Sequence, residues 1–68
     1  MNIEAQELAD QIRATARIMR ECHDKMIKYS CEKWKSNEYV RSQSIFTHAH
    51  EMRCAANTAD TWADGIQS

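Results

Sequence analysis

Three residues of the types that commonly bind zinc lie within seven positions of one another: His48, His50 and Cys54. His50 and Cys54 are four residues apart, which places both on one face of a helix and permits shared ligation. His48 would point about 160° away from His50 on the same helix. Cys22 and His23 could add ligands only if the chain folds back on itself. Because no recognised ligand spacing is present, we expect no bound metal, with His50 and Cys54 as the weak candidates.

A cysteine nucleophile would need a base within hydrogen-bond reach and a cleft with an oxyanion hole. Cys22 and His23 are sequence neighbours, which point apart on a helix. The chain has one glycine and no proline, so it offers no glycine-rich loop to build a cleft. We therefore predict no catalytic residues, no cofactor and no enzymatic activity.

Four basic residues at helical spacing could form a nucleic-acid face: Arg13, Arg17, Arg20 and Lys28. Acidic residues interrupt this row, since Glu21 follows Arg17 by four residues. Asp24 follows Arg20 in the same way. The formal net charge of −1 provides no general attraction for nucleic acid. A solvated helix face with ion pairs at i and i+4 is the favoured interpretation of the row. The pairs expected are Arg17–Glu21, Glu21–Lys25, Arg20–Asp24 and Asp24–Lys28.

The elements that would position these residues are helices. Apolar or small side chains recur at alternating spacings of three and four, which average about 3.5, the period that keeps one stripe of a helix against a partner. The first stripe consists of Ala5, Leu8, Ile12, Thr15, Met19, Cys22, Met26 and Tyr29. It predicts a helix over about residues 3–35, with Asn2 as its N-cap.

A second stripe predicts a second helix, over about residues 38–64. It consists of Ile45, Ala49, Met52, Ala56, Ala59, Ala63 and Ile66. Ser36 and Asn37 are the cap-competent pair between the stripes and predict the turn, and Gly65 is the expected left-handed C-terminal cap. The 68 residues are thus expected to form one domain, an all-α antiparallel helical hairpin in which the stripes face each other and Met52 lies near Cys22.

Large apolar side chains also lie outside both stripes: Ile18, Ile27, Trp34, Val40, Phe46 and Trp62. Chains this short are marginally stable alone and often oligomerise. We therefore expect a homodimer that completes a four-helix bundle. A foreign protein covering the same surface is the competing interpretation. The expected contact residues in either case are Ile18, Ile27, Trp34, Phe46 and Trp62.

A dimeric hairpin with a basic row resembles in architecture the small plasmid-copy regulators of the Rop type, which combine a helical hairpin with RNA binding. The likeness is one of architecture and involves no shared motif. As an alternative function it implies an RNA-binding hairpin dimer that uses Arg13, Arg17 and Arg20.

Cysteine number and hydropathy bear on location. Cys22, Cys31 and Cys54 form no CxxC pair, and an odd number is most simply explained by reduced thiols. No apolar run approaches the 18 or so residues of a membrane span. We expect a cytoplasmic protein that does not bind membranes.

These observations favour a binding function. The chain is expected to be a small non-enzymatic regulator, adaptor or inhibitor that binds another protein through its helical faces. Compact chains without motifs are frequent among the accessory proteins of phages and mobile elements, and we expect this chain to be of that kind.

Overall fold

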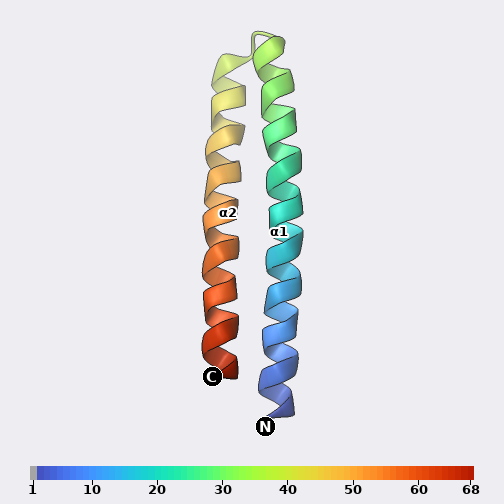
Figure 1. Ribbon diagram of the computed structural model, residues 1–68. Helices are drawn as coiled ribbons and strands as arrows, with labels where there is room; N and C mark the ends of the chain where they lie inside the picture. The colour runs from blue at the N-terminus through green and yellow to red at the C-terminus, as the bar shows by residue number, and fades with distance from the viewer. Residues whose placement is uncertain (1) are drawn as a thin grey trace.

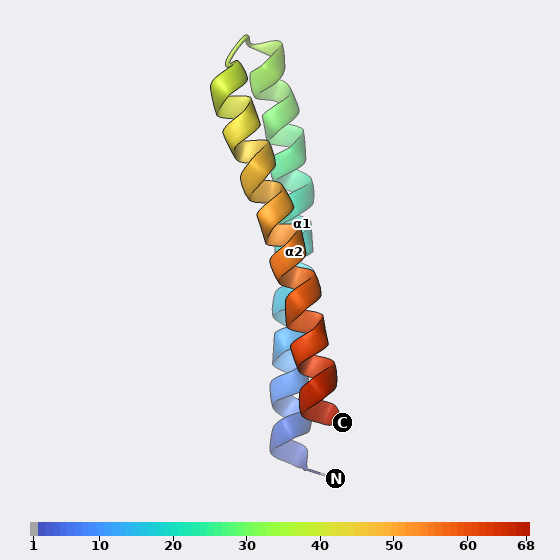
Figure 2. The same ribbon diagram turned by 90° about the vertical axis from the view of Figure 1, so that its left-hand side faces the viewer.

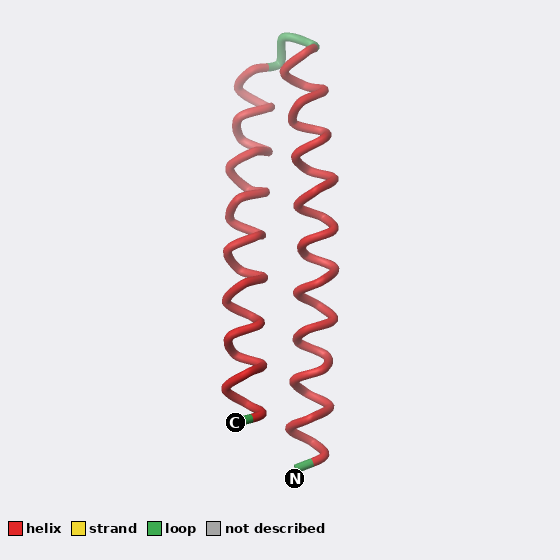
Figure 3. Tube along the Cα trace, in the orientation of Figure 1, coloured by secondary structure: helices red, strands yellow, loops and turns green. Residues whose placement is uncertain are grey.

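Two long helices make up nearly all of the structure, a computed structural model that describes residues 2–68. Helix α1 spans Ile3–Lys35 and helix α2 spans Tyr39–Gln67. They run antiparallel, side by side, with both ends of the chain at the same end (Figure 1). The hairpin measures 54 × 13 × 9 Å along its principal axes. The predicted all-α helical hairpin is confirmed, and residues 2–68 contain no strand (Figure 3).

The first helix begins where the sequence predicts. The side chain of Asn2 accepts hydrogen bonds from the backbone amides of Glu4 (3.0 Å) and Ala5 (3.3 Å). These bonds satisfy two of the amide groups that the first turn of a helix leaves without partners. Glu4 adds a negative charge at the positive end of the helix dipole.

The turn between the helices is one residue longer than predicted and has a different cap. Asn37 is left-handed, with φ of 64°, and its amide donates to the carbonyl of Trp34 at 3.0 Å. The Glu38 amide donates to the carbonyl of Lys33 at 2.9 Å. These two bonds form the Schellman motif that ends a helix, with asparagine in the place that glycine usually takes. Ser36 and Asn37 therefore end α1, and they do not cap α2 as the sequence suggested.

The end of α2 differs from the prediction at Gly65. This glycine does not have a positive φ, and the helix continues through it to Gln67. A single glycine inside a helix costs only about 1 kcal/mol relative to alanine. The last turn therefore stays helical and ends at Ser68, whose amide donates to the carbonyl of Asp64.

Small residues at intervals of seven hold the two helices together. Ser30 and Ser42 lie opposite each other, and each hydroxyl donates to the other residue's carbonyl at 2.7 Å. Because the helices are antiparallel, each step of seven residues back along α1 is matched by a step of seven residues forward along α2. The residues reached by equal steps lie at the same level of the hairpin. The α1 positions are Ala9, Ala16, His23 and Ser30, and the α2 positions are Ala63, Ala56, Ala49 and Ser42. All of these except His23 are buried.

The contact face of α1 is rotated from the predicted stripe. Half of that stripe is exposed to solvent: Leu8, Thr15, Cys22 and Tyr29. The other half is partly buried beside the small residues: Ala5, Ile12, Met19 and Met26. The reason is steric, because alanines allow the helix backbones to approach closely and the bulkier side chains are displaced to the flank. The stripe of α2 is confirmed at its four alanines, which are all buried.

The resulting core is thin. Its buried apolar residues are all alanines, and no large side chain in residues 2–68 is fully buried. The central cluster joins Ala16 to Ala56 and Ala59, with Ile12 and Met19 packed against its edge. Seen from the side, the helices cross at a shallow angle and nothing covers the pair (Figure 2). Most of the bulky apolar surface therefore lies outside the contact between the helices.

Candidate protein-interaction face

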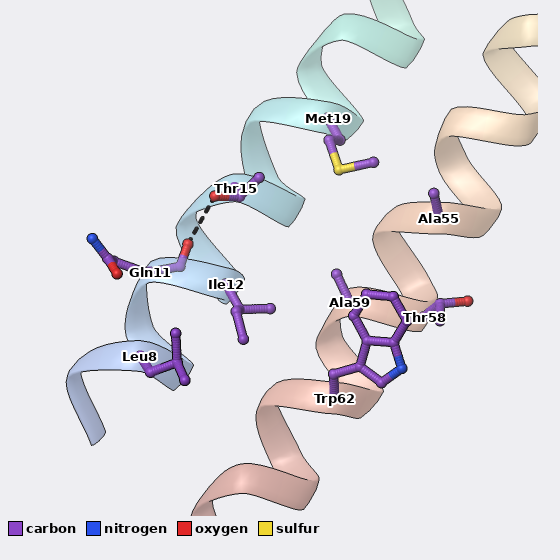
Figure 4. A pocket seen from close by; sticks show the side chains of 9 residues that line it. All are labelled: Leu8, Gln11, Ile12, Thr15, Met19, Ala55, Thr58, Ala59 and Trp62. Atoms are coloured by element: carbon purple, nitrogen blue, oxygen red, sulfur yellow. Dashed lines mark hydrogen bonds between the residues drawn. The ribbon is translucent and has the colours of Figure 1, made fainter. Parts of the chain in front are cut away.

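One flank of the hairpin is hollowed into an uncharged groove of about 600 Å³. It lies in the half of the hairpin that contains the chain ends. Its lining residues come from both helices: Leu8, Gln11, Ile12, Thr15 and Met19 from α1, and Ala55, Thr58, Ala59 and Trp62 from α2 (Figure 4). No lining residue carries a formal charge. The groove therefore has the composition of a surface that excludes water when it is covered.

The groove has bulky walls and a floor of small residues. The side chains of Ile12 and Met19 extend from α1 toward α2, and the indole of Trp62 lies along the opposite wall (Figure 4). Leu8 is 48% exposed and Trp62 is 63% exposed. The Thr15 hydroxyl donates to the carbonyl of Gln11 at 2.9 Å, so this polar group has its partner within α1. Covering the groove would bury apolar surface and leave the Thr15 hydroxyl paired.

The same flank continues toward the turn, because a seven-residue step keeps the same side of a supercoiled helix facing the same way. From Leu8 and Thr15 the row runs on to Cys22 and Tyr29, which are exposed. The neighbouring rows continue through residues that are half-buried: Met26 on α1, and Met52 and Ile45 on α2. We call this flank, made of the groove and these continuations, the open face.

The opposite flank is charged. Arg13 donates to Asp64 across the helices at 2.9 Å. Arg20 donates to Asp60, and also to the side-chain oxygen of Asn57 at 2.9 Å. We call this flank the ion-pair face. In the half with the chain ends, the two flanks therefore differ, with the cross-helix ion pairs on one and the uncharged groove on the other.

The structure changes the predicted pattern of ion pairs along α1. None of the four expected pairs at i and i+4 is formed among residues 2–68: Arg17–Glu21, Glu21–Lys25, Arg20–Asp24 and Asp24–Lys28. Arg20 instead reaches α2, where two acceptors lie within its length. The predicted basic row is thus divided, with Arg13 and Arg20 held by carboxylates of α2. Arg17 and Lys28 take part in none of the ion pairs found in this part of the chain.

The five predicted contact residues are not brought together. Trp62 lines the groove. Ile18, which is 57% exposed, does not line it but lies seven residues after Gln11, in the same row of α1. Ile27 is seven residues from Arg20, and Phe46 is fourteen from Asp60, so both belong to rows of the ion-pair face. Trp34 lies at the turn. The predicted set therefore marks three separate places on the hairpin.

An aromatic cluster closes the turn. The rings of Trp34 and Tyr39 meet edge to face, with centroids 4.5 Å apart. The Lys33 ammonium lies 5.0 Å from the centre of the Tyr29 ring and 3.3 Å from a carboxylate oxygen of Glu38. Hydrogen bonding to Glu38, and next to Tyr29, raises the pKa of Lys33 above its ordinary value. The cluster fixes the turn by packing and charge.

The weak metal candidates come together only as a pair. The Cys54 sulfur lies 3.7 Å from Nε2 of His50. His48 is turned away, with its Nδ1 3.1 Å from a Glu51 carboxylate oxygen. No third histidine, cysteine or carboxylate joins a potential metal site anywhere in residues 2–68. Cys22, expected to face the other helix, is exposed on the open face, and all three thiols are free.

The predicted contact face of α1 is wrong at two of the groove residues. Leu8 and Thr15 were expected to pack against α2, whereas both are exposed and line the groove beside it. Met19 also lines the groove, but it packs against Ala56 and Ala59 of α2 as expected. The feature that could have identified the true contact is the seven-residue repeat of small residues at positions 42, 49, 56 and 63. Its α1 counterpart is harder to recognise, because a histidine interrupts it.

Neither α1 nor α2 is long and apolar enough to cross a membrane. Comparison of the chain with protein-family models, with curated proteins and with solved structures found no match.

Proposed function

We propose that the chain is a small non-enzymatic protein that acts by binding another protein through its helical faces, as a regulator, adaptor or inhibitor. The observation that supports this proposal is the contrast between the core and the open face. The core contains only alanine and serine side chains, while bulky apolar groups such as Leu8 and Trp62 border an uncharged groove. Fully burying a side chain of that size stabilises a complex by about 1.5–3 kcal/mol.

The shape of the groove favours a protein chain over a small molecule. The groove is open along its length and lies between two helices, where a third helix can place apolar residues at i, i+3, i+4 and i+7. Helices that pack in this way complete a bundle. Small-molecule sites, in contrast, enclose most of their ligand and include a few converging polar groups.

The proposal is tested by capturing binding proteins from a cell lysate with variants that change one face of the hairpin at a time. The immobilised wild-type chain is compared with a Leu8→Gln/Trp62→Gln variant and with Phe46→Gln, an equally exposed apolar residue on the ion-pair face. We expect a nuclease-resistant protein that the wild type and Phe46→Gln retain and the double variant loses. Equal capture by all three chains, or loss of all capture after nuclease treatment, would contradict the proposal.

The alternative function, a Rop-like RNA-binding dimer, has weaker support. It needs Arg13, Arg17 and Arg20 to reach phosphates together. Two of these three guanidinium groups are engaged by Asp64 and Asp60. RNA would have to break those ion pairs before it could bind the whole row.

A further inference from the structure

We infer that the occupant of the open face is a second copy of this chain, packed head to tail about a two-fold axis that crosses the helices. The turn of each copy then lies against the chain ends of the other, and four helices form one bundle. This inference rests on the part of the proposed function that assigns protein binding to the open face, and it puts a second copy in the place of a foreign protein there.

In head-to-tail packing the two halves of the open face must fit each other, because the groove of one copy lies against the turn half of the other. The groove provides the small residues Ala55, Thr58 and Ala59. The turn half provides the exposed side chain of Tyr29, in the row that continues from Leu8. No charged group lines the groove and would have to be buried without a partner. The ion-pair face, in contrast, carries guanidinium and carboxylate groups.

The open face is also large enough for a stable dimer. The hairpin is 54 Å long, and two helices side by side are about 20 Å wide with their side chains. Their product is about 1,000 Å² on each copy, compared with the roughly 800 Å² per partner of a standard specific interface. In the turn half the open face continues through the half-buried Met26, Met52 and Ile45, and the rows beside them carry Lys25, His48 and Glu51.

The charge distribution selects the head-to-tail orientation. The half of the hairpin with the chain ends, residues 1–18 and 54–68, holds five acidic and two basic residues, a net charge of −3. The turn half, residues 19–53, holds seven basic and five acidic residues, a net charge of +2. Head-to-tail packing places each negative half against a positive one. Packing with both turns at the same end would place like charges together along the whole length.

The first test is the mass of the full chain in equilibrium sedimentation at micromolar concentration. We expect twice the 7.9 kDa of one chain. Leu8→Lys should raise the dissociation constant of the dimer by about 100-fold, since it places a charge in the interface of each copy. Phe46→Lys is the matched control on the ion-pair face and should leave that constant nearly unchanged. A wild-type monomer, or equal effects of the two variants, would overturn the inference.

A substitution that strengthens the dimer provides a second test, because its result cannot be attributed to a variant that fails to fold. Thr15 lies on the helix surface in the groove, and Thr15→Leu adds apolar volume there. We expect the dissociation constant to fall by about tenfold. An unchanged constant would mean that the groove stays open to solvent and would also contradict the inference.

Orientation is measured with one spin label per chain. The label is attached to Lys35→Cys in a chain whose Cys22, Cys31 and Cys54 are replaced by alanine, after sedimentation confirms that this chain still dimerises. Head-to-tail packing predicts a distance between labels that approaches the 54 Å length of the hairpin. A distance of about 20 Å, one bundle width, would overturn the orientation. A wild-type monomer that captures a foreign protein through Leu8 and Trp62 would reject the second copy and retain the proposed function.

Discussion

At the scale of single residues, the fold depends most on a position where an asparagine occupies a backbone conformation that few side chains tolerate. Asn37 reverses the chain with φ of 64°. Its side-chain oxygen accepts a hydrogen bond of 2.6 Å from the Tyr39 hydroxyl, which ties the turn to the start of α2. Among residues with a side chain, asparagine is one of the few that adopt the left-handed conformation readily. Glycine, which has no side chain, adopts it freely.

Asn37→Ala should therefore lower the free energy of unfolding by about 1 kcal/mol, because alanine is strained at a positive φ. Asn37→Gly should leave the stability equal to that of the wild type or raise it. Tyr39→Phe is the control, since it removes the hydrogen bond to Asn37 and leaves the backbone requirement unchanged. Chemical denaturation followed by circular dichroism measures all three. Equal stability of the alanine and glycine variants would refute the argument.

Lys33 gives a pH prediction in the alkaline range. Its pKa is raised above 10.5, first by the hydrogen bond with Glu38 and next by Tyr29, so its protonated form is favoured in the folded state. The stabilisation that protonated Lys33 gives the fold should be complete below pH 10.5 and be lost as the pH rises through the raised pKa. The difference in melting temperature between the wild type and Lys33→Met should be constant from neutral pH up to 10.5 and shrink above it. A difference that grows at alkaline pH would contradict this assignment.

At the scale of the helices, the close contact between α1 and α2 depends on side chains that are small enough. Ala16 is fully buried against Ala56 and Ala59. Ala16→Leu should push the helices apart and lower the free energy of unfolding by about 1–3 kcal/mol, the usual cost of overpacking. Thr61→Leu enlarges an exposed side chain of α2 that does not line the groove, and it should not destabilise the hairpin. The two variants are compared by thermal unfolding. If Ala16→Leu is as stable as the wild type, the contact between α1 and α2 is looser than described.

The sequence was sufficient to predict these two helices and their antiparallel packing, but not the rotation of α1. Helix formation is local, so the uninterrupted pattern and the Asn2 cap were enough to place the start of α1. The rotation depends on which residues permit the closest approach of the backbones. Alanine is ambiguous in that respect, because it favours helices wherever it stands. Leu8 and Tyr29 therefore looked like the contact face, although Ala9 and Ala16 form it.

The candidate site was predictable only in part, for a related reason. Trp62 was identified from its position outside both stripes, and the structure places it in the groove. The pairing of Arg13 with Asp64 joins residues that are far apart in the chain, and it depends on the rotation of both helices. The groove itself could not be foreseen, because it exists only beside the true contact.

At the scale of the whole molecule, the charged flank bears on the alternative function. Because Arg13 and Arg20 are engaged by α2, we expect binding to structured RNA no tighter than non-specific binding, with a dissociation constant of about 10⁻⁶ M or weaker at physiological salt. Asp60→Asn combined with Asp64→Asn would remove both ion pairs and should raise the affinity several-fold, although Arg20 keeps its hydrogen bond to Asn57.

A fluorescence titration at several salt concentrations measures this binding. Sub-micromolar binding by the wild type that is abolished by replacing Arg13, Arg17 and Arg20 with alanine would make RNA binding the better proposal. Unchanged affinity in the two-asparagine variant would show that the ion pairs do not limit access to the arginines.

Heat stability should depend on protein concentration if the open face is covered by a second copy. A hairpin whose buried apolar residues are all alanines has little surface to remove from water, whereas a dimer also buries Leu8, Met19 and Trp62. Unfolding then separates two chains, so mass action raises the melting temperature by about 5 °C for each tenfold increase in concentration. Leu8→Lys should lower the melting temperature and remove this dependence, and Phe46→Lys should retain it. One cooperative wild-type transition at the same temperature over about two decades of concentration would show that the alanine contact alone stabilises the fold.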